Sequence, residues 1–155
     1  MKEVSYFAPT EVGEAAKLLA EYGDKAAILA GGTDLVAQLN YYEVKPAALL
    51  YIGGLGLDYV REKGGKLVIG AGTTTAHLLA SDLVAQKFPV LAAAAATHGS
   101  PAVRTVATIG GNLGTASPAG DLIPPLMVMD ADVILASVRG ERAVPVKDFF
   151  TGPGE

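Results

Sequence analysis

The sequence predicts an α+β fold built from two unequal subdomains, and three features of the chain support that prediction. Its 155 residues suit one domain of ordinary size. Half of the residues are apolar and 18% are charged, which excludes a disordered chain and predicts a buried interior. Helical and strand-like patterns occur in mixed order, with hairpin signals in the second half. We place the subdomain boundary at a glycine cluster, with residues 1–56 before it and 57–155 after it.

The first subdomain is predicted to alternate short strands with helices. Its strand-like segments are short apolar or alternating runs, whereas its first helix shows apolar side chains at helical spacing and a glycine stop at Gly23. The expected strands are 4–8, 26–30 and 49–52, and the expected helices are 11–22 and 33–40.

The second subdomain is predicted to be mainly helical between two hairpins. Gly64-Gly65 marks the turn of the first hairpin, and residues 139–141 mark that of the second. Pro89 starts an alanine-rich helix that Gly99 ends. The expected hairpin strands are 59–62 with 67–70 and 133–138 with 142–146. The expected helical segments are a short helix that follows residues 73–75 and holds 77–79, the helix 90–97, a further turn of helix that starts at Ser100-Pro101, and a patch that contains 126–129.

Composition excludes several classes of function. The chain has no cysteine, which excludes disulfides, thiolate zinc sites and cysteine-held iron–sulfur clusters on this chain. Its net charge of −4 argues against a nucleic-acid partner. The longest uncharged stretch, residues 105–120, is broken by glycines and Pro118, so we expect no membrane span. Since the first ten residues contain no hydrophobic signal core, we expect a cytoplasmic protein.

Three times, a strand-like run leads into glycine and then into a hydroxyl or amide side chain. The copies are residues 28–33, 68–73 and 108–112. In the first copy, Gly31-Gly32 precedes a predicted helix start, and such a turn lets backbone N–H groups approach an anion closely. A phosphate-binding loop is one interpretation. The other is an ordinary strand-to-helix turn in which Thr33 caps the helix.

The third copy opens an unusual segment, residues 108–121, which is rich in Gly, Thr, Ser and Asn. We interpret it as a long irregular loop that offers many backbone donors, and loops of this length in compact domains are usually functional. Asp121 can accept hydrogen bonds from ligand hydroxyls; capping a helix beside Pro124 is the alternative.

Residues for acid–base catalysis are scarce. We expect His77 and His98 to lie on the surface or at a helix end, and Arg104 either to offset a diphosphate charge or to be solvated or ion-paired. The sequence contains no Ser-His-Asp spacing, paired-carboxylate motif or metal-ligand cluster, so we predict no catalytic and no metal site. A chain that binds a ligand without acid–base groups is typical of a redox-cofactor domain.

Residues 30–35, 69–74 and 100–112 together resemble one family closely, and the resemblance continues through residues 116–122 and 149–152. They are similar to the FAD-binding medium subunit, or FAD domain, of the molybdenum hydroxylases, which include xanthine dehydrogenase, aldehyde oxidase and aerobic carbon monoxide dehydrogenase. The resemblance implies a flavin fold of the vanillyl-alcohol-oxidase type, with FAD between two α+β subdomains.

The resemblance also implies which residues contact FAD. The first glycine loop would wrap the diphosphate, the second would close on it from the other subdomain, and polar residues beyond the second would face the ribityl and ribose hydroxyls. The residues implied are Ala30, Gly31, Gly32, Thr33, Asp34, Leu35, Ala71, Gly72, Thr74, Thr108, Ile109, Gly110, Gly111, Asn112, Thr115, Ser117 and Asp121.

In function, the resemblance implies an electron-transfer subunit that is not a complete enzyme alone. Electrons would come from 2Fe–2S clusters on a small partner subunit, substrate would be oxidised at a molybdopterin cofactor on a large one, and FAD would pass electrons to an external acceptor. Family members usually continue past the Phe149-Phe150 segment, so we expect a C-terminal part of this subunit to be missing. The alternatives are a non-redox nucleotide- or phosphate-binding module and a structural remnant of a flavin subunit.

Overall fold

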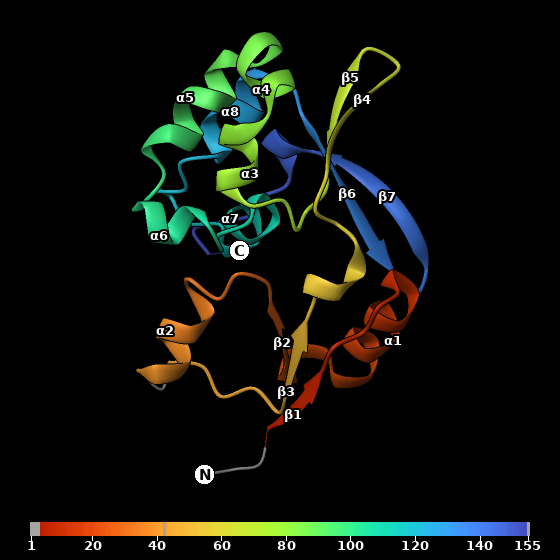
Figure 1. The fold of residues 1–155 in the computed structure, drawn as a ribbon. Helices are drawn as coiled ribbons and strands as arrows, with labels where there is room; N and C mark the ends of the chain where they lie inside the picture. Colours follow the sequence, from red (N-terminus) through yellow and green to blue (C-terminus); the bar gives the residue numbers. More distant parts are fainter. Residues whose placement is uncertain (1–3, 42, 155) are drawn as a thin grey trace.

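The computed structural model describes residues 4–41 and 43–154. Residues 5–51, which we name the sheet region, form a parallel sheet flanked by two helices at the bottom of Figure 1. The strands are β1 (Ser5–Phe7), β2 (Ala26–Leu29) and β3 (Ala48–Tyr51), and the helices are α1 (Val12–Tyr22) and α2 (Leu35–Asn40). Each lies within about two residues of the range predicted from the sequence.

β3 is the central strand of this sheet, in the order β1-β3-β2. Its residues Ala48 and Leu50 are fully buried. α1 lies beside the sheet, and the ring of Phe7 at the end of β1 contacts that of Tyr22 at 5.4 Å between centroids. Gly23, with a φ of 52°, ends α1 as predicted. The sheet region thus presents the ends of its parallel strands toward the rest of the molecule (Figure 1).

The remaining chain folds into short helices and two antiparallel hairpins. The hairpins pair β4 (Val60–Lys63) with β5 (Lys66–Ile69), and β6 (Asp132–Ser137) with β7 (Gly140–Pro145). The helices, which make up the helical region of residues 75–128, are α3 (Thr75–Ala80), α4 (Asp82–Lys87), α5 (Pro89–Thr97), α6 (Pro101–Arg104), α7 (Ile109–Thr115) and α8 (Ile123–Val128). Short 3-10 turns cover Gly23–Lys25, Gly53–Leu55 and Val146–Asp148.

A single apolar core holds the helical region together. α5 packs against α3, α4 and α8, and it contributes Leu91 and Ala95 to this core. The buried residues of the core are Leu78, Val84, Leu91, Ala95, Ile109, Leu122, Leu126 and Val146. Since Ile109 belongs to this core, the second glycine motif is anchored in it.

The two hairpins close differently. The first hairpin turns at Gly64-Gly65 as predicted, and both glycines have the positive φ, 60° and 75°, that a two-residue turn between Lys63 and Lys66 requires. The second turn lies at residues 138–139 and not at 139–141 as predicted, because Gly140, with a φ of 101°, already pairs with Ser137. β6 also contacts α1, so this hairpin extends from the helical region to the sheet region (Figure 1).

The largest error of the sequence analysis concerns residues 108–121. The structure places only an isolated bridge between Thr108 and Thr74 where a strand was expected, and α7 occupies the first half of the expected irregular loop. The helix forms because its first N–H groups find acceptors in the neighbouring segment 71–73 and in the Thr108 side chain. Among the described residues, no helix has both the length and the hydrophobicity of a membrane span. The subdomain boundary near residue 56 stays a prediction.

Candidate functional site

The first glycine loop, residues 30–35, connects β2 to α2. Gly31 packs on the backbone of Val106 in the helical region, so closely that a Cβ atom here would overlap the Val106 carbonyl group. Gly32 has a φ of 75°, in the left-handed region that favours glycine. One glycine therefore permits contact between the two regions, and the other permits the turn.

The main-chain N–H groups of this loop have no acceptor among the described residues. The hydrogen bonds there include none donated by the backbone nitrogens of residues 31–35. Asp34 holds the N-cap position of α2 and its side chain makes no capping bond, so the alternative prediction of a Thr33 cap is wrong. Unpaired N–H groups at a helix start attract an anion. The loop therefore has the chemistry that phosphate binding needs.

The second glycine motif differs, because its donors are already bonded. Thr108 is the N-cap of α7, and its Oγ1 accepts the Gly111 N–H at 3.0 Å. The N–H groups of Ile109 and Gly110 donate to the carbonyls of Thr73 and Ala71, each at 2.9 Å. That this motif contacts a diphosphate stays a prediction, and the visible task of its donors is to attach α7 to the neighbouring segment.

The segment 70–74 is hydrogen-bonded to the start of α7. Besides the Ala71 carbonyl, it contributes the Gly72 N–H, which donates to Leu57 at 2.9 Å, and the Thr74 hydroxyl, which caps α3 by accepting the His77 N–H at 3.1 Å. The predicted ligand contacts of Ala71, Gly72 and Thr74 stay predictions.

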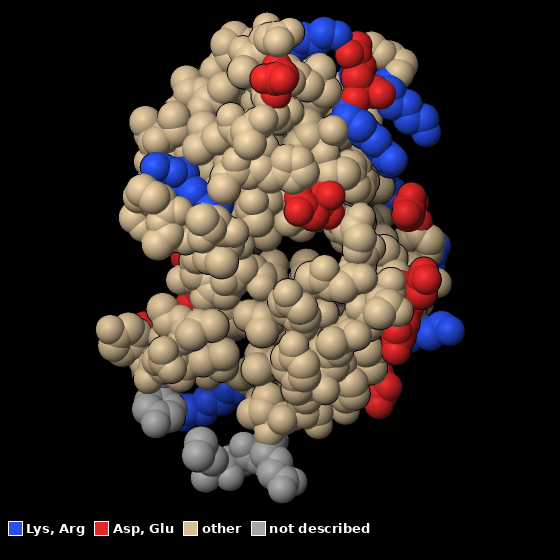
Figure 2. All heavy atoms as spheres, in the orientation of Figure 1, with Lys and Arg blue, Asp and Glu red and all other residues tan. Residues whose placement is uncertain are grey.

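A pocket of about 280 Å³ lies between the sheet region and the helical region. Figure 2 shows the surface hollowed between these two regions. Most lining side chains are polar: the lining residues are Thr33, Asp34, His98, Val103, Asn112, Thr115, Ser117, Ala119, Gly120 and Asp121. Six of the seventeen predicted contact residues therefore line one pocket, although Thr33 and Asp121 belong to opposite halves of the chain.

Hydrogen bonds connect the residues that line the pocket with one another and with neighbouring segments. The Thr115 hydroxyl donates to the Asp34 carboxylate at 3.4 Å, which joins α7 to the first glycine loop. The Asn112 Oδ1 accepts the Leu122 N–H at 3.2 Å. α8 begins after Leu122 without a side-chain cap, so Asp121 does not have the capping role that was its alternative. Its carboxylate is exposed in the pocket and free to accept a ligand hydroxyl.

The remaining predicted residues lie around this pocket without lining it. They are Ala30, Gly31, Gly32, Leu35, Ala71, Gly72, Thr74, Thr108, Ile109, Gly110 and Gly111. Gly110 packs on Ala71, where a Cβ would come within 2.7 Å of the Ala71 side chain. Glycine at this position therefore permits close contact between α7 and Ala71.

Sequence reasoning missed His98, which was expected at the surface or at a helix end. It does follow the last residue of α5, but it is half-buried and lines the pocket. Its Nδ1 lies 2.8 Å from the Thr75 hydroxyl.

Among the described residues Arg104 forms no ion pair, and its contact with a diphosphate stays a prediction. Its Nη1 donates to the carbonyls of Ala96, His98 and Gly99 at 2.9–3.3 Å, so the guanidinium caps the end of α5. The other histidine, His77, lies 2.6 Å from the exposed Asp58 carboxylate and does not line the pocket. Within the described residues there is no cluster of His, Asp and Glu that could hold a metal ion.

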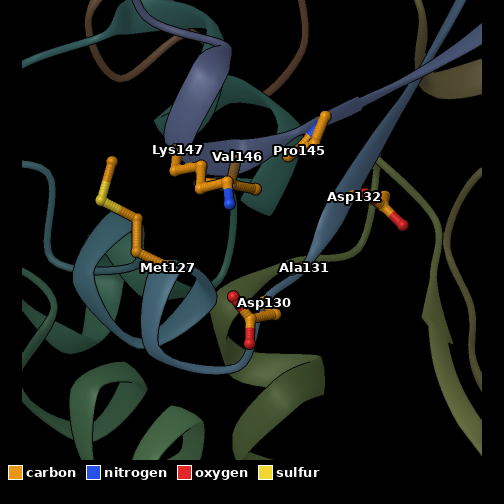
Figure 3. Close-up of a pocket in the computed structure, with 7 residues that line it drawn as sticks. All are labelled: Met127, Asp130, Ala131, Asp132, Pro145, Val146 and Lys147. Carbon is orange, nitrogen blue, oxygen red and sulfur yellow. The ribbon is translucent and has the colours of Figure 1, made fainter.

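A second, smaller pocket of about 180 Å³ lies where the second hairpin meets α8 (Figure 3). Asp130, with a φ of 49°, makes the turn from α8 into β6 at its edge. The seven lining residues are Met127, Asp130, Ala131, Asp132, Pro145, Val146 and Lys147. None of them belongs to a predicted contact motif, so the pocket at the first glycine loop is the candidate site.

The chain matches the family model described as "FAD binding domain in molybdopterin dehydrogenase" over residues 2–155. It is 41% identical to the nicotinate dehydrogenase FAD-subunit of Eubacterium barkeri, with 99% of this chain and 53% of that relative covered. It is 36% identical to the carbon monoxide dehydrogenase medium chain of Hydrogenophaga pseudoflava, over 95% of this chain and 52% of that one. The chain thus spans about half the length of the curated relatives it matches.

Solved structures agree with the fold. A carbon monoxide dehydrogenase structure from Hydrogenophaga pseudoflava superimposes with a TM-score of 0.96 at 35% identity, covering 99% of this chain and 54% of that one. Quinoline 2-oxidoreductase from Pseudomonas putida 86 gives a TM-score of 0.94 at 30% identity, covering 100% and 55%. The α+β flavin fold expected from the resemblance is confirmed.

Proposed function

The chain belongs to the family of FAD-binding domains of molybdopterin dehydrogenases, and on that premise we propose that it is part of the electron-transfer subunit of a molybdenum-containing hydroxylase. In the proposed complex, electrons leave iron–sulfur clusters on a small partner subunit and reach an external acceptor through FAD held by this chain. Substrate is oxidised at a molybdopterin cofactor on a large partner subunit. The relatives named as medium chain and FAD-subunit support this division of labour.

The residues present fit FAD. The observation that carries the proposal is the pocket that joins the first glycine loop to Asn112, Thr115, Ser117 and Asp121. The free N–H groups of residues 31–35 match an anionic diphosphate, and the amide, hydroxyl and carboxylate side chains match the hydroxyls of a ribityl chain or ribose. A pocket of this size is near the lower end of the range of about 300–1000 Å³ for ligand sites, so it suits one portion of a dinucleotide.

FAD, when bound, supplies the redox chemistry, since the chain has no cysteine that could hold an iron–sulfur cluster. The task of the chain's residues is to bind and orient the cofactor. The first glycine loop holds the diphosphate, and the Thr115–Asp34 bond keeps the two sides of the pocket together around it. The close contact of Gly31 with the Val106 backbone attaches this loop to the helical region.

Titration of the folded chain with FAD tests the cofactor part of the proposal. We expect saturable binding, seen as quenching of flavin fluorescence and retention of visible absorbance through a desalting column. ADP should compete, because it carries the same diphosphate. A folded chain that stays colourless after incubation with FAD would contradict the proposal. If the chain binds ADP as tightly as FAD, the flavin part of FAD contributes nothing to affinity. That result would favour a nucleotide-binding module without redox function.

Co-purification tests the partner assignment. The chain, expressed together with an iron–sulfur subunit and a molybdopterin subunit of the same enzyme class, should elute with both. Substrate-dependent bleaching of flavin absorbance in that assembly would support the electron path. Assembly without any flavin bleaching would leave FAD binding intact and refute the proposed path.

A further inference from the structure

His98 has one ring nitrogen fixed in the protein interior. It follows α5 and faces α3, where its Nδ1 lies 2.8 Å from the Thr75 Oγ1. Thr75 is fully buried, its N–H donates to the Ala107 carbonyl at 3.0 Å, and its hydroxyl lies 3.4 Å from the same carbonyl. Since the ring lines the pocket and Nδ1 is engaged, Nε2 is the nitrogen left for a molecule in the pocket.

The negative charge of the pocket explains why an anionic ligand needs a hydrogen bond from Nε2 of His98. Two carboxylates, Asp34 and Asp121, line the pocket and would repel an anion. Among the described lining residues, His98 is the only one that can carry a positive charge. Arg104, the nearest guanidinium in sequence, is already bonded to three carbonyls at the end of α5. A diphosphate in this pocket therefore needs His98 as well as the backbone N–H groups of the first glycine loop.

We propose that His98 is a further binding residue for the FAD diphosphate, donating from Nε2–H to a phosphate oxygen, and that Thr75 is its positioning residue. This inference rests on the proposed function. No covalent or redox step is involved: His98 contributes a charge-assisted hydrogen bond, of the kind that is shorter and stronger than a neutral one.

The hydroxyl of Thr75 suits this role in both charge states of the ring. It can donate to Nδ1 of the neutral ring, which puts the proton on Nε2. It can also accept from Nδ1–H of the imidazolium while donating to the Ala107 carbonyl. In each case Nε2–H points away from Thr75 and is free to donate. An anion in the pocket selects these two states over the tautomer that lacks the Nε2 proton.

The first test measures FAD affinity of the full chain and its variants by fluorescence titration. His98→Ala should weaken binding by about tenfold or more, since hydrogen bonds to charged groups are the strong class. His98→Gln, which keeps an N–H donor, should lose less. The matched control is His77→Ala, because His77 is the only other histidine and lies outside the pocket. Equal affinities of the parent chain and His98→Ala, or equal losses in both alanine variants, would overturn the inference.

Thr75 is tested by rescue. Thr75→Val removes the hydroxyl at nearly constant volume and should weaken FAD binding although His98 is intact, whereas Thr75→Ser should restore it. Serine failing to restore the affinity of a folded variant would mean that Thr75 acts only by packing.

Nitrogen NMR of the two histidine rings gives a readout that does not depend on affinity. Addition of FAD should shift the Nε2 signal of His98 toward that of a protonated, hydrogen-bonded nitrogen and leave the His77 ring signals in place. If FAD binds to the parent chain but the nitrogen signals of both histidine rings do not shift, the inference is wrong and the proposed function stands. If the folded parent chain binds no FAD, the proposed function fails and the inference fails with it.

Discussion

At the scale of single residues, Gly31 forms a close contact between the sheet region and the helical region. A methyl group there would overlap the Val106 carbonyl, which is backbone and cannot rotate away. We expect Gly31→Ala to lower the free energy of unfolding by roughly 1–3 kcal/mol, the usual cost of overpacking. Urea titration of the variant and the parent chain measures this difference in unfolding free energy.

The control for that variant is Gly114→Ala. Gly114 lies in α7, and a Cβ there would meet no atom within 4 Å. Alanine should stabilise this position by about 0.5–1 kcal/mol, because it favours the helix. Equal effects of the two alanines would show that the contact with Val106 does not matter.

Asp121 offers a second prediction. Because its side chain caps no helix, Asp121→Ala should leave the unfolding free energy of the FAD-free chain within about 0.5 kcal/mol of the parent value. FAD affinity should fall by about 1–3 kcal/mol, the cost of leaving ligand hydroxyls unpaired. Melting curves with and without FAD separate the two quantities. A stability loss of the same size in both conditions would argue against ligand contact.

Some of these residues could be predicted from the sequence and others could not, for a physical reason. Thr33, Asp34 and Asn112 stand in or beside glycine pairs, and the demands of tight backbone geometry are local enough to be visible in a sequence. His98 is different. Its position depends on the Thr75 hydroxyl and on the Arg104 cap of α5, and both partners are brought to it only by helix packing.

At the scale of elements, α7 shows where local preferences are overridden. Three of its seven residues are glycines, each of which disfavours a helix by about 1 kcal/mol relative to alanine. The sequence therefore predicted a loop. The helix forms because the backbone N–H groups of Ile109 and Gly110 donate hydrogen bonds to segment 71–73, and these tertiary bonds offset the low helix propensity of the glycines.

The cap of α7 should consequently carry much of its stability. Thr108→Ala removes the hydroxyl that accepts the Gly111 N–H, and we expect a loss of about 1 kcal/mol in unfolding free energy. Thr108→Ser keeps the acceptor, so its unfolding free energy should fall by a few tenths of a kcal/mol at most. Thermal melts of the three proteins give the comparison, and matching losses for Ala and Ser would mean that the methyl group, not the cap, matters.

The two glycine motifs should also behave differently in hydrogen exchange. The amides of residues 31–35 have no acceptor among the described residues and should exchange rapidly in the free chain, then slow when FAD binds. The amides of Ile109, Gly110 and Gly111 are already bonded and should be protected with and without FAD. Peptide-resolved exchange followed by mass spectrometry can resolve this. FAD-dependent slowing confined to residues 109–111 would reverse our assignment of which motif holds the diphosphate.

At the scale of the whole molecule, a ligand held by both regions should stabilise them together. At about 100 times its dissociation constant, FAD should add about 2.7 kcal/mol to the unfolding free energy. We expect one unfolding transition whose midpoint rises with FAD concentration, since the pocket takes residues from the sheet region and from the helical region. Calorimetry that resolves two transitions, with only one moved by FAD, would show that the ligand contacts one region alone.

The contact between α1 and β6 also bears on how the protein is made. More than a hundred residues separate these two elements, so α1 leaves the ribosome long before the strand it packs against exists. At synthesis rates of about 5–20 residues per second, that delay is roughly 5–20 seconds. During it the nascent chain carries a helix whose apolar face is incompletely covered, and exposed apolar surface is what chaperones bind. The contact of α1 with β6 therefore waits for translation of the second hairpin, and slow codons before residue 132 would lengthen the period of exposure.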